Sequence, residues 1–472
     1  MLTGNRAVLR MLGQCLLFAI VLATWSPKAF SQVWDAVGFF RYNIEKIGVI
    51  ALPTTPPSYS VKIVFSVTNP ANADSPWDIK NAVPFQSNAA QLTFDIGWDS
   101  SFDFTNKGSN GGTLTPLTGS TDAAAFPVRI ASLTSNAPAT AGNAKACTVA
   151  DCGPTEANRF FSVATVTPLP FGAAVKTGRV VLEGRPVCNG SVYSVTCPLP
   201  TYSATAPLVP IYANIPVMSA AKDFTFAPTA SLAAIVGDPR RQIVDINKCK
   251  SCHDDANHGT GVVPRLSLHG ANRNENLAVC VVCHNPNQTD VPYRRATTAL
   301  EDPRISGPEV PLDFKTMVHS IHSGGFRTQP FVVIGFRSSV NDFSDVRFPR
   351  ELRDCTNCHI DASGKGTFEL PLRAGVLGTT IKTQSTYLTT PRSIDVDPAN
   401  DVKISPIAAV CSSCHDRTEV KSHMVNTGGA SFSTTQSQIG VTVKERCANC
   451  HGPGKDKDVR KAHEIGNAGH DD

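Results

Sequence analysis

Five copies of one short motif, Cys-x-x-Cys-His, constrain this chain of 472 residues more than any other feature of its sequence. The copies lie in the second half of the chain, at Cys249-Lys-Ser-Cys252-His253, Cys280-Val-Val-Cys283-His284, Cys355-Thr-Asn-Cys358-His359, Cys411-Ser-Ser-Cys414-His415 and Cys447-Ala-Asn-Cys450-His451. Two thiols three positions apart lie about one helical turn from each other and can form thioethers with the two vinyl groups of a haem. The imidazole that follows can bind the iron. The motifs therefore predict five c-type haems, each with the histidine of its motif as the proximal iron ligand.

A single Cys-x-x-Cys pair is also typical of a zinc site or of a redox-active dithiol. Here each of the five pairs is followed directly by histidine, and every cysteine after residue 248 belongs to one of the motifs. The repeated pattern favours haem attachment over both alternatives.

The ligand on the second side of each iron decides what such a protein can do. An iron with an open position, or one capped by lysine, would bind small substrates such as nitrite, whereas an iron with histidine on both sides mainly exchanges electrons. All 12 histidines of the chain lie at or after His253, and seven of them are outside the motifs. Histidine is therefore in sufficient supply for five distal positions, and mixed His/Met ligation is the weaker option.

Five of the seven remaining histidines are the preferred distal ligands. His319 and His322 stand at i and i+3 in the run Met317-Val-His-Ser-Ile-His322, so a helical turn would place both on one face and bring two haems close together. The other three preferred ligands are His269, His423 and His463. His258 has polar, Gly-rich neighbours and His470 lies in the terminal segment, where chains commonly fray, so these two are the reserve candidates.

The first half of the chain follows a different pattern. Between residues 32 and 240, hydrophobic side chains alternate with polar ones at residues 59–67, 92–98 and 126–130, which is typical of half-buried strands. Further β-rich runs lie at residues 160–167, 179–183 and 208–217. Short strands with Gly-, Pro-, Asn- and Ser-rich turns predict an antiparallel β-sandwich or split barrel. This predicts a β-domain over residues 32–240 and a pentahaem domain of short helices and long loops over residues 241–472. Four cysteines of the β-domain can pair in three ways, of which the sequence-local disulfides Cys147 to Cys152 and Cys188 to Cys197 are preferred.

The N-terminus predicts export. Residues 1–31 contain Arg6 and Arg10, an apolar stretch from Leu16 to Trp25 and small residues before Gln32, as in a cleaved signal peptide. Without this segment the chain has 40 bases against 39 acids, so a nucleic-acid partner is not expected. No apolar run is long enough to span a bilayer, so we expect no transmembrane helix in the mature chain, and a location in the periplasm or at the outer cell surface.

The chain also resembles the outer-surface decahaem cytochromes of the OmcA/MtrC family, which reduce minerals, metal complexes and flavins outside the cell. The resemblance rests on Leu268-His269-Gly270 with Arg273, Cys283-His284-Asn285-Pro286, the run from Asp313 to His322, Val346-Arg-Phe-Pro349, Cys414-His415-Asp416 with His423-Met424, Cys450-His451-Gly-Pro-Gly454 with Asp458-Val459 and His463, and, in the β-domain, Trp77-Asp78-Ile79 and Ile96-Gly97-Trp98.

The resemblance implies a split Greek-key β-barrel followed by a pentahaem domain in which all haems are bis-His. His269, His319, His322, His423 and His463 fall on the distal positions of the family. It also implies electron-donor and electron-acceptor redox proteins as partners, among them a porin-cytochrome conduit of the outer membrane, with a flavin or metal as acceptor. The five motifs correspond to one half of a decahaem protein.

Three functions compete at this point. The leading prediction is an electron-transfer protein that relays electrons through five bis-His haems, with at most a non-specific metal or flavin reductase activity and no catalytic residues of its own. The second is a multihaem reductase with one open iron, such as a nitrite reductase, although the chain contains no Cys-x-x-Cys-Lys sequence. The third is a structural or adhesive role for the β-domain.

Overall fold

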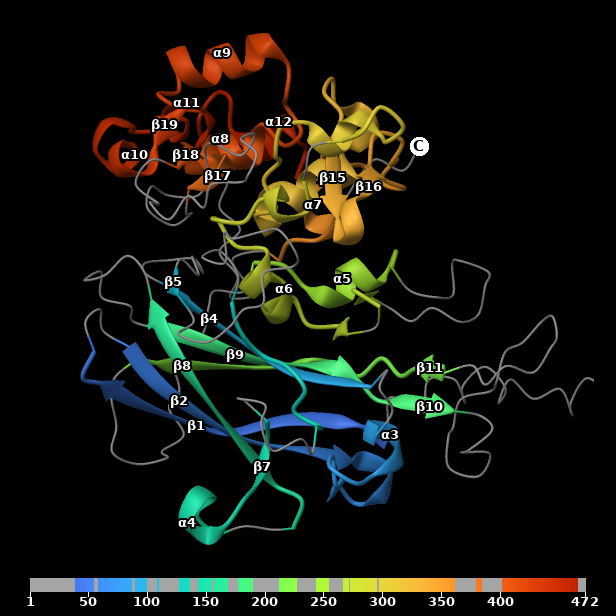
Figure 1. Ribbon diagram of the computed structural model, residues 1–472. Helices are drawn as coiled ribbons and strands as arrows, with labels where there is room; N and C mark the ends of the chain where they lie inside the picture. The colour runs from blue at the N-terminus through green and yellow to red at the C-terminus, as the bar shows by residue number, and fades with distance from the viewer. Residues whose placement is uncertain are drawn as a thin grey trace, which may run out of the picture.

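The structure is a computed structural model, and its described residues form two regions. We call residues 39–226 the β region and residues 243–465 the Cys-rich region, and Figure 1 shows them as a lower and an upper body. The described residues are 39–54, 58–86, 90–99, 108–109, 127–135, 143–154, 157–168, 177–189, 212–226, 243–253, 266–270, 272–294, 297–360, 379–383 and 401–465. The signal-peptide prediction for residues 1–31 and the reserve ligands His258 and His470 therefore lie outside the described residues.

The first sheet of the β region is antiparallel and has six strands. Its main path runs β1 (Arg41–Leu52), β2 (Ser58–Asn69), β8 (Phe160–Pro168) and β5 (Gly108–Ser109), while β3 (Ser75–Pro76) pairs with β2 and β7 (Lys145–Ala146) with β8. The period-two pattern at residues 59–67 predicted β2, the β-rich run at residues 160–167 predicted β8, and both predictions are confirmed.

Strand β1 was not predicted, and a β-bulge is the reason. Its register against β2 shifts between Ile44 and Lys46, so one extra residue interrupts the alternation of hydrophobic and polar side chains. Ile47 and Val49, which follow the bulge, are fully buried. A search for strict alternation reads this run as irregular although it forms one continuous strand.

The second sheet lies against the first and completes a sandwich. Its order is β12 (Ala220–Thr225), β9 (Thr177–Arg185), β4 (Gln91–Asp99) and β6 (Val128–Ile130), again antiparallel. Phe65 of the first sheet meets Phe94 of the second edge-on, with ring centroids 4.8 Å apart, and Trp98 is fully buried in the same cluster. The described strands form two facing antiparallel sheets, as the predicted sandwich requires, and no closed barrel is detected among them.

The outer face of the second sheet is covered by the Cys-rich region. Val181 of β9 packs against Val279 and Val282 of helix α6 (Leu277–Cys283), while its neighbours Val180 and Leu182 point into the sandwich core. Strand β9 is therefore buried on both faces, and Figure 1 shows α6 lying directly over β4 and β9.

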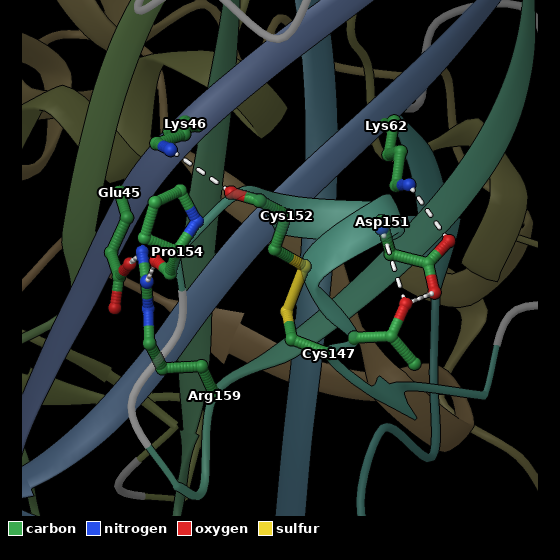
Figure 2. Close-up of a disulfide and its surroundings, with 9 residues drawn as sticks. Glu45, Lys46, Lys62, Cys147, Asp151, Cys152, Pro154 and Arg159 are labelled. Carbon is green, nitrogen blue, oxygen red and sulfur yellow. Dashed lines mark hydrogen bonds and ion pairs between the residues drawn. A yellow bond between two sulfur atoms is a disulfide. The ribbon is translucent and has the colours of Figure 1, made fainter.

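The disulfide between Cys147 and Cys152 is present, as predicted, with the two Cα atoms 5.8 Å apart. It closes the one-turn helix α4 (Val149–Cys152), which two lysines hold against the sheet (Figure 2). Lys46 donates to the carbonyl oxygen of Cys152 at 3.0 Å, and Lys62 forms an ion pair with Asp151 at 3.3 Å. Helix α4 lies at the end of the β region that points away from the Cys-rich region, so the disulfide stabilises a surface loop far from the motifs (Figure 1).

The second predicted disulfide lies mostly outside the described residues. Cys188 lies in β10 (Val187–Asn189), which pairs with β11 (Tyr212–Asn214), but its side chain and all of Cys197 are outside the described residues. This pairing stays a prediction. The remaining short elements of the β region are helix α3 (Val83–Gln86) and the 3₁₀ turn η2 (Pro70–Asn72).

The described part of the Cys-rich region consists of short elements, as predicted, and the longest helices in it have nine residues. Its helices are α5 (Ile246–Lys250), α6, α7 (Phe314–His322), α8 (Pro406–Cys411), α9 (Thr418–Asn426), α10 (Gln436–Thr442), α11 (Ala448–His451) and α12 (Val459–Ala462). Its strands are β13 (Ser267–Leu268), β14 (Arg273–Asn274), β15 (Val332–Gly335), β16 (Ser339–Asp342), β17 (Thr380–Thr383), β18 (Val402–Ile404) and β19 (Thr434–Thr435). Its 3₁₀ turns are η5 (Val291–Tyr293), η6 (Pro303–Ser306), η7 (Gly324–Phe326), η8 (Phe336–Ser338) and η9 (Cys355–Asn357).

Buried polar contacts hold much of this region together. The carboxylate of Asp290 accepts hydrogen bonds from Arg294 at 2.6 and 2.7 Å and from the backbone amides of Val310 and Ile334, both at 2.9 Å. Both charged side chains are buried, so the ion pair joins three segments where an apolar core would otherwise be expected. Within the described part of the chain, no helix has the length and apolar character needed to cross a membrane.

Candidate haem centres

All five Cys-x-x-Cys-His motifs adopt the same local geometry. In each, the backbone amide of the histidine donates a hydrogen bond to the carbonyl oxygen of the first cysteine, at 3.0 Å for His253, 2.8 Å for His284, 2.9 Å for His359, 2.8 Å for His415 and 2.8 Å for His451. This closes one helical turn, so that both cysteines and the imidazole project from a single short element. The ten motif cysteines form no disulfide, which leaves their sulfur atoms available for thioether bonds.

Each motif histidine faces one further histidine, and no histidine is shared. The ring centroids are 5.9 Å apart for His253 and His322, 6.1 Å for His284 and His269, 6.0 Å for His359 and His319, 6.0 Å for His415 and His463, and 6.2 Å for His451 and His423. The five partners are the five residues that the sequence favoured as distal ligands.

The separation of about 6 Å fits a metal ion between the two rings. It is too long for a direct hydrogen bond between ring nitrogens, but it accommodates two metal–nitrogen bonds of about 2 Å together with the radius of each ring. A zinc site would need three or four protein ligands gathered around one point. Among the residues that the structure describes, no group of three or more Cys, His, Asp and Glu side chains has such an arrangement. The residues present therefore fit haem and not zinc.

Backbone carbonyl groups fix the orientation of at least five of the ten rings. The Nδ1 atom lies 3.1 Å from the oxygen of Leu312 in His284, 2.6 Å from Lys315 in His319, 2.9 Å from Val318 in His322, 3.1 Å from Ile243 in His359 and 3.0 Å from Lys457 in His451. A ring whose Nδ1–H donates to a carbonyl presents a bare Nε2 atom, which is the usual arrangement of a metal-binding histidine.

Burial also keeps several of these rings neutral, which a metal ligand requires. Burial, with nearby Arg273, lowers the pKa of His269 to about 3. Burial likewise lowers the pKa of His284 to about 4 and that of His359 to about 4. The pKa values of His319 and His463 are lowered by the same cause.

His269 has an unusual backbone conformation. It lies in the turn between β13 and β14 with a positive φ of 55°, and Gly270 follows with a φ of 69°. The side-chain amide of Asn272 donates to the carbonyl oxygen of His269 at 3.0 Å and stabilises the turn. Histidine is among the few non-glycine residue types that adopt this conformation with some frequency, and here the conformation directs the ring toward His284.

The comparison with protein families agrees with this geometry. Residues 241–464 match the model of the outer membrane cytochrome MtrC/MtrF-like family, domains II/IV. The Cys-rich region belongs to the OmcA/MtrC family of multihaem cytochromes. A comparison of the chain with curated proteins finds no match.

In this cytochrome region, helix α7 connects the first and third motifs. His322 faces His253 of the first motif, and His319, one turn earlier, faces His359 of the third. The predicted helical turn is confirmed, and the two histidines serve two different motifs.

The first and third motifs also contact each other directly. Lys248 donates from its ammonium group to the carbonyl oxygens of Thr356 at 2.7 Å and His359 at 3.0 Å, and the amide of Asp245 donates to Cys358 at 3.1 Å. The thiol groups of Cys249 and Cys358 lie close to each other, since each affects the pKa of the other. Two attachment sequences about 100 residues apart thus lie side by side.

The end of α7 also contacts the fourth motif of the cytochrome. Ser323 donates to the carbonyl oxygen of Ser413 at 2.9 Å, and Asp416 accepts hydrogen bonds from the amides of Thr328 at 3.0 Å and Gln329 at 2.7 Å. The segment that follows α7 is therefore fixed against the residues on either side of Cys414 and His415.

The fourth and fifth motifs form a further unit. Helix α9 directly follows the fourth motif and carries His423, which faces His451 of the fifth, while His463 after α12 returns to His415 of the fourth. Glu445, two residues before the fifth motif, accepts from the amides of Ile407 and Ala408, both at 2.8 Å, and so caps the helix of the fourth motif.

One group of charged residues beside the second motif was not predicted, and its two acids are buried. Asp95, Arg129 and Glu183 come from the β region and meet Arg273 of the cytochrome region. They lie at positions that would face solvent in a one-sided sandwich, so only the presence of α6 over this sheet could have revealed them.

Proposed function

We propose that the chain binds five c-type haems through the ten motif cysteines and relays electrons among them. His253, His284, His359, His415 and His451 are the proximal ligands, and His322, His269, His319, His463 and His423, in that order, are the corresponding distal ligands. The observation that carries this proposal is the one-to-one pairing of the ten rings at about 6 Å.

A bound c-type haem supplies one-electron exchange at its iron. The protein side chains decide what that iron can do. Two histidines would occupy both open positions of each iron and leave none for nitrite, oxygen or peroxide, and Nδ1 contacts such as those of His284 and His319 hold the rings in place. These contacts favour electron transfer over the alternative of a reductase with an open iron.

The contacts among motifs support an order of electron transfer. His319 and His322 on one helix, together with the contact between Cys249 and Cys358, favour direct exchange between the haems of the first and third motifs. The segment after α7 lies against the fourth motif, whose partner helix leads to the fifth. We propose that α7 is the junction through which the haems of motifs one, three and four communicate.

The family relationship supports the proposed setting of this activity. Export through residues 1–31, a β-domain over residues 32–240 and a pentahaem domain over residues 241–472 are part of the proposal. The proposed partners are redox proteins that donate or accept electrons, including a porin-cytochrome conduit, and the proposed terminal acceptors are flavins or metals. The proposed location is the periplasm or the outer cell surface.

Intact-mass spectrometry of the purified exported protein tests the stoichiometry. We expect the mass of the polypeptide plus five haems, and we expect the reduced protein not to bind carbon monoxide. A mass with four haems, or rapid binding of carbon monoxide to one haem in five, would contradict the proposal and favour the reductase alternative.

A further inference from the structure

His269 differs from the other four distal histidines in the element that carries it. His319 and His322 lie on α7 of the Cys-rich region. His423 lies on α9 and His463 directly follows α12, which belong to the same region. His269 instead lies in the turn between β13 and β14, with a positive φ. A positive φ at a residue other than glycine persists only where the surrounding structure holds it, so the contacts of this turn decide where the ring lies.

The β region contacts this turn at the end of β9. The amide of Gly184 donates to the carbonyl oxygen of Asn272 at 3.0 Å, and the guanidinium group of Arg185 donates to the carbonyl oxygen of Gly270. The two segments approach closely, because a Cβ atom on Gly270 would lie only 2.8 Å from Nη1 of Arg185. Gly270 directly follows His269 in the chain. Arg185 therefore holds the residue next to the predicted ligand.

The residue before β12 holds β14, the strand that leaves the turn. Ser219 donates from its amide to the carbonyl oxygen of Asn274 at 3.1 Å, and its Oγ atom accepts from the amide of Asn274 at 3.2 Å. The side-chain amide of Asn274 donates to Val217 at 2.9 Å, and that of Asn276 donates to Ser219 at 2.8 Å. Ser219 and Asn274 are buried, so the loss of one partner would leave the other polar group unsatisfied.

An ion pair adds a third attachment to the β region. Arg273 of β14 donates to Oε1 of Glu183 at 2.7 Å and lies 3.8 Å from Asp95. Arg129 also pairs with both acids, so two acids and two bases balance each other there. Leu268, the apolar residue before His269, is 49% exposed and does not anchor the turn by packing. Hydrogen bonds and charges from the β region therefore fix the turn.

The two rings of this histidine pair are held by different regions. The Nδ1 atom of His284 lies 3.1 Å from the carbonyl oxygen of Leu312, within the Cys-rich region. That region also reaches the segment after the turn, where Lys250 pairs with Glu275 at 3.1 Å, but this contact lies beyond β14. The separation of 6.1 Å between the rings of His269 and His284 therefore depends on the contact between the two regions.

We propose that the β region positions the distal ligand of the second haem, with Arg185 as the principal positioning residue. This inference rests on the proposed function. When Arg185 no longer holds Gly270, the turn relaxes and His269 moves out of reach of the iron. An iron with one free axial position binds external ligands, whereas the four other pairs are built from helices of the Cys-rich region and stay closed. Docking of the β region thus decides whether the second haem only relays electrons.

The test compares variants of the full-length, five-haem protein by electron paramagnetic resonance and by binding of carbon monoxide. In Arg185→Ala we expect five attached haems, with a high-spin signal and carbon monoxide binding of up to one haem in five. Arg185→Lys should restore the low-spin state, because an ammonium group can donate to the same carbonyl oxygen. The double variant Arg185→Ala/His269→Ala should show no more high-spin haem than His269→Ala, one in five, because both changes act on the same iron.

The matched control is Arg159→Ala. Arg159 is also an arginine of the β region that pairs with an acid, Glu45, and donates to a backbone carbonyl, that of Pro154 at 3.0 Å. It lies at the disulfide end, away from the turn (Figure 2). We expect this variant to remain fully low-spin. The same high-spin signal in Arg159→Ala would overturn the inference, because general destabilisation of the β region would then be sufficient.

A fully low-spin Arg185→Ala protein would also overturn the inference, as would two high-spin haems in five in the double variant. If Arg185→Ala does not fold, Ser219→Ala replaces it. This change removes one hydrogen bond to Asn274, and we expect a smaller high-spin fraction of the same haem, whereas a fully low-spin protein would overturn the inference. A wild-type protein with fewer than five haems, or a fully low-spin His269→Ala variant, would instead contradict the proposed function.

Discussion

The two regions of this molecule are held together by different physical means. The β region has one apolar cluster between two sheets, in which Phe65, Phe94 and Trp98 are fully buried. Among its described residues, the Cys-rich region has an apolar cluster of five buried residues around Ala408 and Ala409, and it uses buried polar contacts such as that of Asp290 with Arg294. The comparison teaches that the β region completes its core with its own side chains, whereas the Cys-rich region would use the proposed haems as structural material.

Among the changes considered, removal of the haems should have the most different effects on the stability of the two regions. When the chain is produced without haem attachment, we expect the Cys-rich region to lose its defined structure, because few apolar side chains remain to replace the cofactors. The β region should keep its sheets. Limited proteolysis with mass spectrometry measures this, and equal protection of both regions would contradict the comparison.

A double substitution of the α7 histidines should damage only the Cys-rich region. In His319→Ala/His322→Ala we expect five covalent haems to remain, because attachment needs only the motifs, while two of the five become high-spin. Electron paramagnetic resonance measures the spin states. His258→Ala is the control and should stay fully low-spin. If the double variant also stays low-spin, the two rings are not iron ligands.

The extent to which these features follow from the sequence differs between fold and site. The sequence predicted the five motifs and the distal histidines. It did not predict which distal histidine faces which motif, because only the tertiary fold brings pairs such as His253 and His322 together. Strand β1 was missed because a bulge after Ile44 breaks its alternation. Glu183 was missed because alternation shows which residues share a face of a strand but not whether a helix covers that face.

One substitution in the core of each region tests, through the free energy of unfolding, whether the two regions are stabilised by different means. Phe94→Ala removes a fully buried ring and should lower the free energy of unfolding of the β region by about 3–5 kcal/mol, with haem spectra unchanged.

Asp290→Asn should have the converse effect on the Cys-rich region. It leaves the charge of Arg294 buried without its partner, which costs about 3–5 kcal/mol. Denaturation followed in parallel by far-ultraviolet circular dichroism and by haem absorbance separates the two responses. Identical shifts of both signals in both variants would show that the regions unfold as one unit.

The disulfide should have the smallest effect. Replacing Cys147 and Cys152 by serine opens a loop of only a few residues, so the expected loss is about 2 kcal/mol and is confined to the β region. The potentials of the haems should not change, because α4 lies at the far end of the molecule (Figure 1). A shift in any haem potential would show that the disulfide is coupled to the redox centres after all.

The central claim is that ten histidines form five axial pairs. Near-infrared magnetic circular dichroism of the oxidised wild-type protein tests it most directly, because the position of the charge-transfer band reports the two axial ligands of a low-spin haem. We expect only His/His ligation, with an intensity that corresponds to five haems per chain. A His/Met or His/Lys band, or a high-spin signal equal to one haem in five, would contradict the pairing of these rings.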